Sequence, residues 1–469
     1  MMRRMRWAED GGGTWELDME APVTMEGAAR AVPGDPLPLG LSRGRRITRP
    51  KQLDFMHRFM SSPLVPSFSG YPTNGGQGLL FYHAYTSHLA ENWCATILQQ
   101  INVQKFLPFI KEISANHLKE IPWPKTIYKH FAQIFSWGLG TEFLLTQDSS
   151  FLVEFYNVQK NTRGKAVFNQ KLRGHNLTLE TAWPGLFVDR SGTYWDVPLS
   201  MAIDFASVSS DSGLSYHFCL QHNSGKPKHF GGNETTRIPS SLLPGLCARA
   251  ALSFKNNFFF WKKKDGKLKM VQPYDVLLSD PHISASGVIG TVASVSLGDC
   301  SARFSDEERL HLQASNAFRI CAQRNNLAAF VDFFASLSTS AQYGNFQRPF
   351  LDLTRLNAQM HFPSGSSFLS GVAGLAQNLY NSQELNLEQL GAVCPELTLS
   401  LQQQIIGPFS FRVDSRILFT PNERNKVAQV EESVFAIDWA LKVLGSAKAT
   451  AWYSPRRQEA MVELRFFER

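Results

Sequence analysis

The sequence predicts a mainly β protein: a membrane-spanning antiparallel β-barrel preceded by a basic, partly helical N-terminal region. Three observations predict this class. Apolar and polar residues alternate over unusually long stretches, charged residues stay off the apolar face, and no run of about 20 apolar residues offers a spanning helix. Without such a helix, closed β structure is the remaining way to satisfy backbone hydrogen bonds inside a membrane. We assign residues 1–140 to the N-terminal region and residues 141–469 to the barrel.

The longest alternating stretch lies between residues 246 and 260. Its register lasts about 15 residues, whereas globular strands run to about 5–6 residues and tilted membrane strands need about 9–11. Arg249 and Lys255 fall on the face opposite the apolar one, as a polar lumen requires. On a lipid-facing surface each would cost about 2–4 kcal/mol. The apolar face consists of Leu246, Ala248, Ala250, Leu252, Phe254, Phe258 and Phe260, with Asn256 as a polar break.

Three further segments alternate in the same way, near residues 194–207, 433–444 and 461–467. A soluble β-sandwich or lipid-carrier fold also has half-buried alternating strands, and it stays an alternative. Strand length and the placement of charges favour the barrel. The apolar faces of the three segments are Val197, Leu199, Met201, Ile203 and Phe205; Phe435, Ile437, Trp439, Leu441 and Val443; and Val462, Leu464 and Phe466.

The charge balance indicates an anionic partner. The chain of 469 residues has a formal net charge of +7 at pH 7, which attracts it to nucleic acid or to an anionic membrane. Because the sequence holds no finger-type Cys/His spacing and no RNP-type aromatic motif, we expect membrane lipid and no nucleic acid. The six cysteines form no CxxC pair, so we expect neither a disulfide framework nor a zinc site. We also expect no other metal and no cofactor.

The first twenty residues do not have the features of a targeting segment. They contain no apolar core of the kind found in signal peptides, and they include five acidic residues, which transit peptides avoid. We therefore expect neither a signal peptide nor a transit peptide at this end of the chain.

Catalytic motifs are not found in the sequence. It has no GxSxG elbow, P-loop, HExxH or dinucleotide-type GxGxxG. His217 and His222 are five residues apart, which on a strand puts them on opposite faces, so a shared metal is not expected. We expect no enzyme activity, although catalytic groups that converge from distant positions leave that alternative open.

A basic cluster in the N-terminal region is the first candidate site. Its six cations lie within 16 residues and are followed by apolar residues at helical spacing. An Arg side chain can hold a phosphate oxygen pair through two parallel hydrogen bonds, so the cluster suits a lipid phosphate. A solvated, charged loop has the same composition and stays an equal alternative. The candidate residues are Arg43, Arg45, Arg46, Arg49, Lys51 and Arg58.

A second candidate lies in PKTIYKHFAQIFSWGL, residues 124–139. Apolar residues share one helical face there and basic residues lie beside it, which is typical of a helix at a membrane interface. A helix packed on the protein's own core has the same pattern. The apolar face consists of Ile127, Phe131, Ile134 and Phe135, and the neighbouring cations include Lys125 and Lys129.

Five strings carry a family resemblance: VPGDPLPLGLSRGRRITRPKQLDFMHRFMSSPLVPSFS, WPGLFVDRSGTYWDVPLSMAIDFAS, LSLQQQIIGPFSFRV, YSPRRQEAMVELRFFER and SAQYGNFQRPFLDLTR. The chain resembles the plant trigalactosyldiacylglycerol lipid-trafficking proteins along most of its length. This resemblance implies a β-barrel of the chloroplast outer envelope, with contact to the endoplasmic reticulum. It also implies a homodimer that binds phosphatidic acid and acts upstream of an ABC-type lipid transporter of the inner envelope.

The resemblance further implies where lipid binds and what happens to it. The basic cluster belongs to the family's lipid-binding region, and a second lipid site falls near residues 111–143. We expect transfer of lipid precursors from the endoplasmic reticulum to the plastid for galactolipid synthesis. A passive anionic-lipid tether at membrane contacts and a lipid-modifying enzyme are the alternatives. The cations of the second site are Lys111, Lys119, Lys125 and Lys129.

Overall fold

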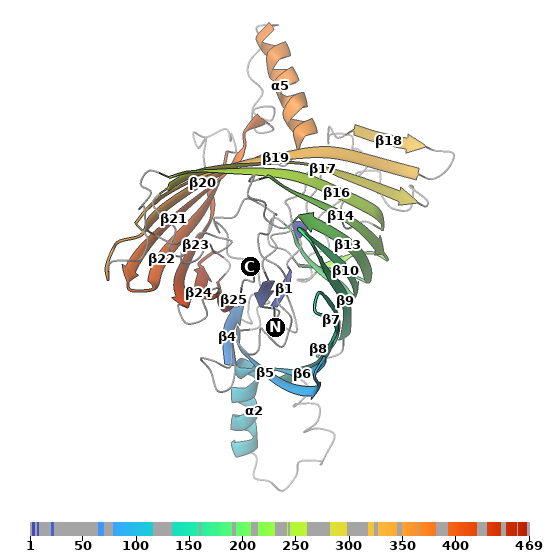
Figure 1. The fold of residues 1–469 in the computed structure, drawn as a ribbon, viewed down its shortest axis with the longest axis vertical. Coiled ribbons are helices and arrows are strands. Elements are labelled where there is room, and N and C mark those ends of the chain that lie inside the picture. Colours follow the sequence, from blue (N-terminus) through green and yellow to red (C-terminus); the bar gives the residue numbers. More distant parts are fainter. Residues whose placement is uncertain are drawn as a thin grey trace.

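A closed sheet of antiparallel strands dominates the computed structural model (Figure 1). All structural statements below concern the residues that the structure describes. These are residues 2–4, 7–8, 20–22, 64–69, 78–115, 134–158, 161–189, 194–207, 214–229, 242, 244–259, 282–297, 318–322, 327–344, 349–362, 364–380, 393–419, 429–441, 447–456 and 458–466.

The barrel sheet contains nineteen described strands, and one of them, β18, pairs with β19 alone, so eighteen form the ring. Neighbours follow chain order and are antiparallel, and the last strand pairs with the first to close the ring. The strands are β4 (Leu64–Ser69), β5 (Gly78–Ala90), β6 (Trp93–Asn102), β7 (Phe135–Thr146), β8 (Ser149–Val158), β9 (Asn161–Leu172), β10 (His175–Trp183), β13 (Leu199–Ser207), β14 (Leu214–Ser224), β16 (Gly245–Phe259), β17 (His282–Leu297), β18 (Phe318–Ala322), β19 (Leu327–Tyr343), β20 (Thr354–Phe362), β21 (Glu396–Ile406), β22 (Phe409–Leu418), β23 (Gln429–Leu441), β24 (Ala447–Ser454) and β25 (Glu459–Phe466).

The strand pairing confirms the predicted barrel and changes two of its details. The ring includes β4, β5 and β6, so the barrel begins at Leu64 and the expected boundary at residue 140 does not match the sheet. Polar residues occur at both odd and even positions between residues 78 and 90, so the sequence shows no clear alternation there. The stretch expected to run through Val197 as one strand divides at Pro198, and Val197 belongs to a separate strand, β12 (Tyr194–Val197).

The two ends of the barrel differ in their connections. Because every ring neighbour is antiparallel, alternate connections lie at the same end. One end, here called the turn rim, has the two-residue connections 91–92, 147–148, 173–174 and 407–408. The opposite end, the loop rim, has the connections that contain both described helices. By the same alternation, β4 begins and β25 ends at the turn rim.

The wall has reversed polarity, with apolar side chains outside and polar ones inside. On β21, Leu401 is 49% exposed on the outer surface, whereas Gln402 and Gln404 beside it are buried. On β23, Ile437 and Trp439 are exposed and Asp438 between them is 2% exposed. A soluble sandwich buries its apolar face instead, so the outer surface matches a wall surrounded by lipid.

Aromatic side chains gather near both rims. Trp93 stacks on Phe143 with ring centroids 5.1 Å apart, and Phe409 stacks on Trp439 at 5.4 Å, both near the turn rim. Near the loop rim, Trp183 meets the ring of Phe155 edge-on. Membrane barrels have such aromatic girdles at both interfaces, because amphipathic rings favour the headgroup level.

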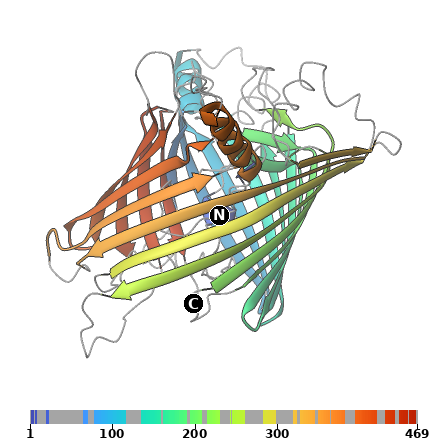
Figure 2. The same cartoon turned by 90° about the horizontal axis from the view of Figure 1, so that it is seen from above.

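Two described helices leave the loop rim at separate places on the ring (Figures 1 and 2). These are α2 (Val103–Ala115), which follows β6, and α5 (Gly365–Tyr380), which follows β20. Within the described ranges, neither helix is long and apolar enough to cross a membrane.

Two small sheets accompany the barrel. One pairs β1 (Met2–Arg4) with β3 (Glu20–Pro22), and Figure 1 draws β1 within the ring. The other contains four strands at the loop rim and has a core formed by Phe187, Trp195, Val197 and Leu242. Its strands, in sheet order, are β15 (Lys228–His229), β12, β11 (Gly185–Asp189) and β2 (Trp7–Ala8).

Candidate functional site

The structure describes only one of the ten cations that the sequence analysis assigned to the two candidate lipid sites. Lys111 lies on α2 and is exposed. The helix predicted for residues 124–139 overlaps the described chain only from Ile134 onward, and Phe135 begins strand β7 instead. The candidate-site cations outside the described residues are Arg43, Arg45, Arg46, Arg49, Lys51, Arg58, Lys119, Lys125 and Lys129.

Helix α2 presents both charge and apolar surface at the loop rim. Asn102 precedes the helix, and its side-chain oxygen accepts the backbone N–H of Lys105 at 3.1 Å, which is an N-cap interaction. Lys105 and Lys111 are exposed, and Leu107 between them is 54% exposed. Lys side chains can lay their stems on apolar surface while the ammonium groups reach water or headgroups. The helix can therefore lie at a membrane interface.

The inner wall holds a network of ionic and polar side chains on β21 to β24. Arg412 Nε lies 3.5 Å from Asp414 Oδ2 and 3.4 Å from Asp438 Oδ2. Asp438 also accepts hydrogen bonds from Thr450 at 2.6 Å and from Gln402 at 3.4 Å. The charged side chains are at most 2% exposed, and removing one partner would leave the other charge buried.

Other cations of the inner wall are also paired with carboxylates. Lys165 Nζ lies 3.3 Å from Glu180 Oε1, and Arg416 Nε lies 2.7 Å from Glu431 Oε2. In these pairs, as in that of Arg412, a carboxylate offsets the positive charge of the cation. The wall can accept polar groups through its many amides and hydroxyls, but these paired cations are not a ready phosphate site.

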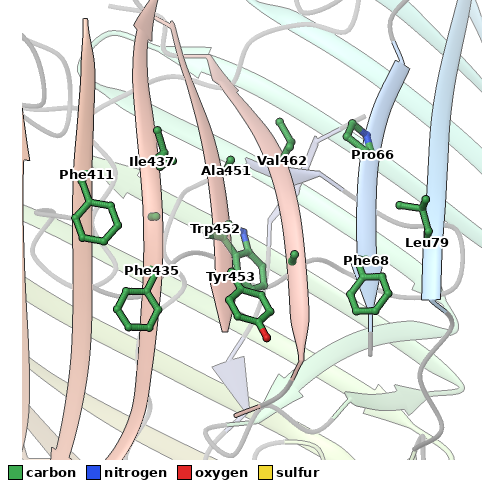
Figure 3. Close-up of a pocket in the computed structure, with 12 residues that line it drawn as sticks. Pro66, Phe68, Leu79, Phe411, Phe435, Ile437, Ala451, Trp452, Tyr453 and Val462 are labelled. Carbon is green, nitrogen blue, oxygen red and sulfur yellow. The ribbon is translucent and has the colours of Figure 1, made fainter. Parts of the chain in front are cut away.

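The outer surface has a groove of about 430 Å³ across β22 to β25 and β4 to β5 (Figure 3). Its floor includes the small side chains of Ala451 and Ala460, and larger apolar side chains flank them. No charged residue lines it. This surface, called the seam groove below, is lined by Pro66, Phe68, Leu79, Phe411, Phe435, Ala436, Ile437, Ala451, Trp452, Tyr453, Ala460 and Val462.

Strand register explains why the groove forms. One row of directly paired residues runs from Phe435 through Tyr453 and Ala460 to Phe68, and from there to Leu79. The neighbouring row contains Ile437, Ala451 and Val462. Directly paired side chains on one face of a sheet are neighbours. An alanine in each row, on adjacent strands, therefore leaves a depression between larger side chains.

Sequence reasoning did not find the seam groove. Its residues come from six strands, and the rows run across the sheet instead of along the chain. Within any one strand, the lining residues are ordinary members of the alternating pattern. To predict the groove from sequence, one would have to know the register between strands, above all how the first barrel strand pairs with the last.

No cluster of three or more His, Cys, Asp or Glu suited to a metal ion occurs among the described residues. Cys94, Cys219 and Cys247 are free thiols and are buried, and Cys394 is a free thiol that is half-buried.

Comparison with known proteins gives a full-length relative. The Arabidopsis thaliana protein TRIGALACTOSYLDIACYLGLYCEROL 4, chloroplastic, is 46% identical over 481 aligned residues, which cover 100% of each chain. No family model matches. The crystal structure of Pseudomonas aeruginosa OccK11 (OpdR) overlaps 86% of this chain and 93% of its own, with a TM-score of 0.35 and 8% identity. The fold described above rests on strand pairing and not on this overlap.

Proposed function

Because the chain belongs to the family of the Arabidopsis TRIGALACTOSYLDIACYLGLYCEROL 4 protein, we propose that it is a phosphatidic-acid-binding lipid-transfer protein. It works in the chloroplast outer envelope and moves lipid precursors from the endoplasmic reticulum to the plastid for galactolipid synthesis. The relative's name includes the word chloroplastic, which supports a plastid location. The structural observation that carries the proposal is the wall of reversed polarity, apolar outside and polar inside.

This wall suits a protein that handles amphipathic molecules. The outer surface meets acyl chains, whereas the inner surface offers side-chain amides, such as those of Gln100, Gln221 and Gln402, and hydroxyls, such as that of Ser410, to a polar headgroup. A lipid that follows the wall can keep each of its parts in a matching environment. The protein transfers the lipid chemically unchanged and acts without a cofactor or a metal.

The N-terminal basic cluster captures the phosphate headgroup. Its arginines can bind a phosphomonoester through paired hydrogen bonds, which a single serine-linked phosphodiester accepts less well. Each basic residue near an anionic surface adds about 1 kcal/mol before screening. Lys111 on α2, which is exposed at the loop rim, belongs to the second lipid site that includes Lys119, Lys125 and Lys129.

Partners complete the proposed pathway. The protein forms a homodimer, receives lipid where the envelope contacts the endoplasmic reticulum, and supplies an ABC-type lipid transporter of the inner envelope. The sequence has no P-loop for ATP, and the downstream transporter supplies the direction of transfer. A passive tether that binds anionic lipid without moving it is the alternative, and lipid-transfer assays separate the two.

Vesicle co-sedimentation tests the headgroup site. The Arg43/Arg45/Arg46→Ala variant is compared with wild type on vesicles containing phosphatidic acid, phosphatidylserine at matched surface charge, or phosphatidylcholine alone. The Lys262/Lys263/Lys264→Ala variant is the matched control, because it removes three positive charges from another part of the chain. We expect the arginine variant alone to lose roughly tenfold in affinity for phosphatidic acid vesicles, about half of the ~3 kcal/mol that three cations can contribute.

Two outcomes would contradict the site or its selectivity. Equal binding to phosphatidic acid and phosphatidylserine would show a general electrostatic surface. Unchanged binding by the arginine variant would remove the basic cluster from the headgroup site and direct attention to the cations of residues 111–143.

A further inference from the structure

Among the described strands, the shortest ladder of the ring is the one that closes it. Strands β25 and β4 share three paired residues, from Glu459 opposite Ser69 to Met461 opposite Ser67. By contrast, β24 and β25 share eight paired residues, and β4 and β5 share six. Since backbone hydrogen bonds hold neighbouring strands together, the β4–β25 seam is the part of the ring that opens most easily.

Pro66 accounts for the end of this ladder. The next pair would set Val462 opposite Pro66, and the described pairing stops one residue before it. Proline has no backbone N–H to donate, so it occurs in sheets mainly at edges and where pairing ends. Residues Val462 to Phe466 therefore pair with β24 on one side, and the described part of β4 does not extend the ladder on the other.

The seam groove lies over this short ladder on the outer surface (Figure 3). Phe68 on β4 and Ala460 on β25 are direct partners in the ladder, and both line the groove. The surrounding outer surface consists of exposed apolar side chains such as Ile437 and Tyr453. In a membrane, the molecules that contact this surface are lipid acyl chains.

The inner surface beside the seam is also locally apolar. Val434, Ala436 and Trp452 form a buried cluster on the lumen side of β23 and β24. Further along the ring, the lumen side carries mainly amides, hydroxyls and charged groups. An acyl chain that passed between β4 and β25 would thus find apolar side chains on both surfaces of the wall.

We propose that one acyl chain of a membrane glycerolipid docks in the seam groove, and that the lipid enters the barrel laterally where β4 and β25 separate. This inference rests on the proposed transfer function and names its entry site. The groove sits at the weakest ladder, is lined without charge, and continues the apolar outer surface. Those three features together select an acyl chain as its occupant.

Photolabelling tests the docking step. Purified protein in phosphatidylcholine vesicles is irradiated with a phosphatidic acid whose acyl chain ends in a diazirine, and mass spectrometry locates the label. We expect residues that line the groove to be labelled several-fold above other outer-surface residues. Ala451→Trp fills the floor and should lower groove labelling about tenfold, as the loss of roughly two buried methylenes would. Ala358→Trp, on the outer face of β20, should leave it unchanged.

A reversible disulfide tests the lateral entry. Directly paired Cα atoms lie about 4.5–5.5 Å apart, within the range that a disulfide spans. The Phe68→Cys/Ala460→Cys variant, with the six native cysteines replaced by alanine, should close the seam on oxidation. The Ile97→Cys/Leu139→Cys variant places the same bond between β6 and β7. We expect oxidation to slow vesicle-to-vesicle lipid transfer at least about tenfold in the seam variant only, with full recovery on reduction.

The outcomes separate this inference from the proposed function. Undiminished transfer through the oxidised seam would overturn lateral entry, although transfer itself would stand. If neither wild type nor the reduced variants transferred lipid, both the transfer function and the entry route would be overturned. The photolabelling result would still show whether an acyl chain docks in the groove. Uniform labelling of the outer surface would overturn docking. Protein–protein cross-links at the groove would assign it to a second copy and would also overturn it.

Discussion

Arg163 on β9 and Asp196 on β12 face each other through two parallel hydrogen bonds, Nη1 to Oδ1 at 2.7 Å and Nη2 to Oδ2 at 2.9 Å. This pair connects the barrel wall to the small sheet at the loop rim. The side chains are only 8% and 18% exposed, so little water competes for either charge. Together with the core formed by Phe187, Trp195 and Val197, the pair fixes the small sheet over this part of the rim.

Breaking the Arg163–Asp196 pair should loosen the small sheet. In Asp196→Ala the guanidinium of Arg163 stays largely buried without this carboxylate, which should cost about 2 kcal/mol, below the ~3–5 kcal/mol for a fully buried pair. Hydrogen exchange at the amides of β11 and β12 measures the effect. The Arg163→Ala/Asp196→Ala variant is the control, and its cost should be well below the sum of the single changes. An additive result would show that the pair contributes no coupling.

Position 290 requires glycine because the ring of Phe334 occupies the space that a side chain at this position would fill. An added Cβ at Gly290 would lie 2.2 Å from Phe334 Cζ and 2.7 Å from the backbone oxygen of Ala250. Gly290→Ala should therefore destabilise the barrel by about 1–3 kcal/mol. Gly287→Ala on the same strand is the matched control, since its Cβ would approach nothing closer than 3.9 Å. Denaturant titration in vesicles measures both, and equal stabilities would contradict the account of this packing.

The polarity of the wall predicts that a lysine costs more stability on its outer face than on its inner face. Leu337 on β19 is 45% exposed on the outer surface, and Ser340 on the same strand faces inward. Leu337→Lys should destabilise the vesicle-embedded protein by about 2–4 kcal/mol, because the ammonium would face hydrocarbon. Ser340→Lys should cost less, since its ammonium can reach polar groups of the lumen. The reverse order would contradict the assignment of the two faces.

Helix α5 depends on a cap at its first turn. Ser364 Oγ accepts the backbone N–H of Ser367 at 3.2 Å and donates to Asp332 on β19 at 2.5 Å. Ser364→Ala should destabilise the helix by about 1 kcal/mol, which raises hydrogen exchange of its first-turn amides roughly fivefold. Ser370→Ala, inside the helix, serves as the control and should change exchange little. Equal exchange in the two variants would show that the cap does not hold the helix.

The barrel could be predicted from sequence because apolar, outward-facing residues alternate with inward-facing residues along each single strand. In β16, Leu246, Leu252 and Phe254 are exposed and Cys247 and Ala251 are buried, as the alternation predicts. This alternation can be recognised within one strand, without knowledge of its neighbours. The length of the alternating stretch distinguishes a membrane-spanning strand from a strand of a globular protein. The expected class, a membrane-spanning antiparallel β-barrel, is therefore confirmed from local information.

Features that depend on contacts between strands could not be predicted. Val197 continues the apolar alternation of the next strand, yet it is fully buried in the small sheet, because Pro198 separates the two. The seam groove depends on the pairing of Ala460 with Phe68, residues almost 400 positions apart in the chain. The basic cluster, from Arg43 to Arg58, lies outside the described residues and stays a prediction from sequence.

Transfer of intact phosphatidic acid tests the central claim most directly. Protein is reconstituted into acceptor vesicles, isotopically labelled phosphatidic acid is supplied in donor vesicles, and the acceptors are separated by density and analysed by mass spectrometry. We predict that labelled, chemically unchanged phosphatidic acid reaches the acceptors at least about tenfold faster than without protein. Labelled lipid that stays in donors while the vesicles associate would indicate a tether. Labelled lipid recovered as a cleaved or dephosphorylated product would indicate an enzyme, and either result would contradict the account.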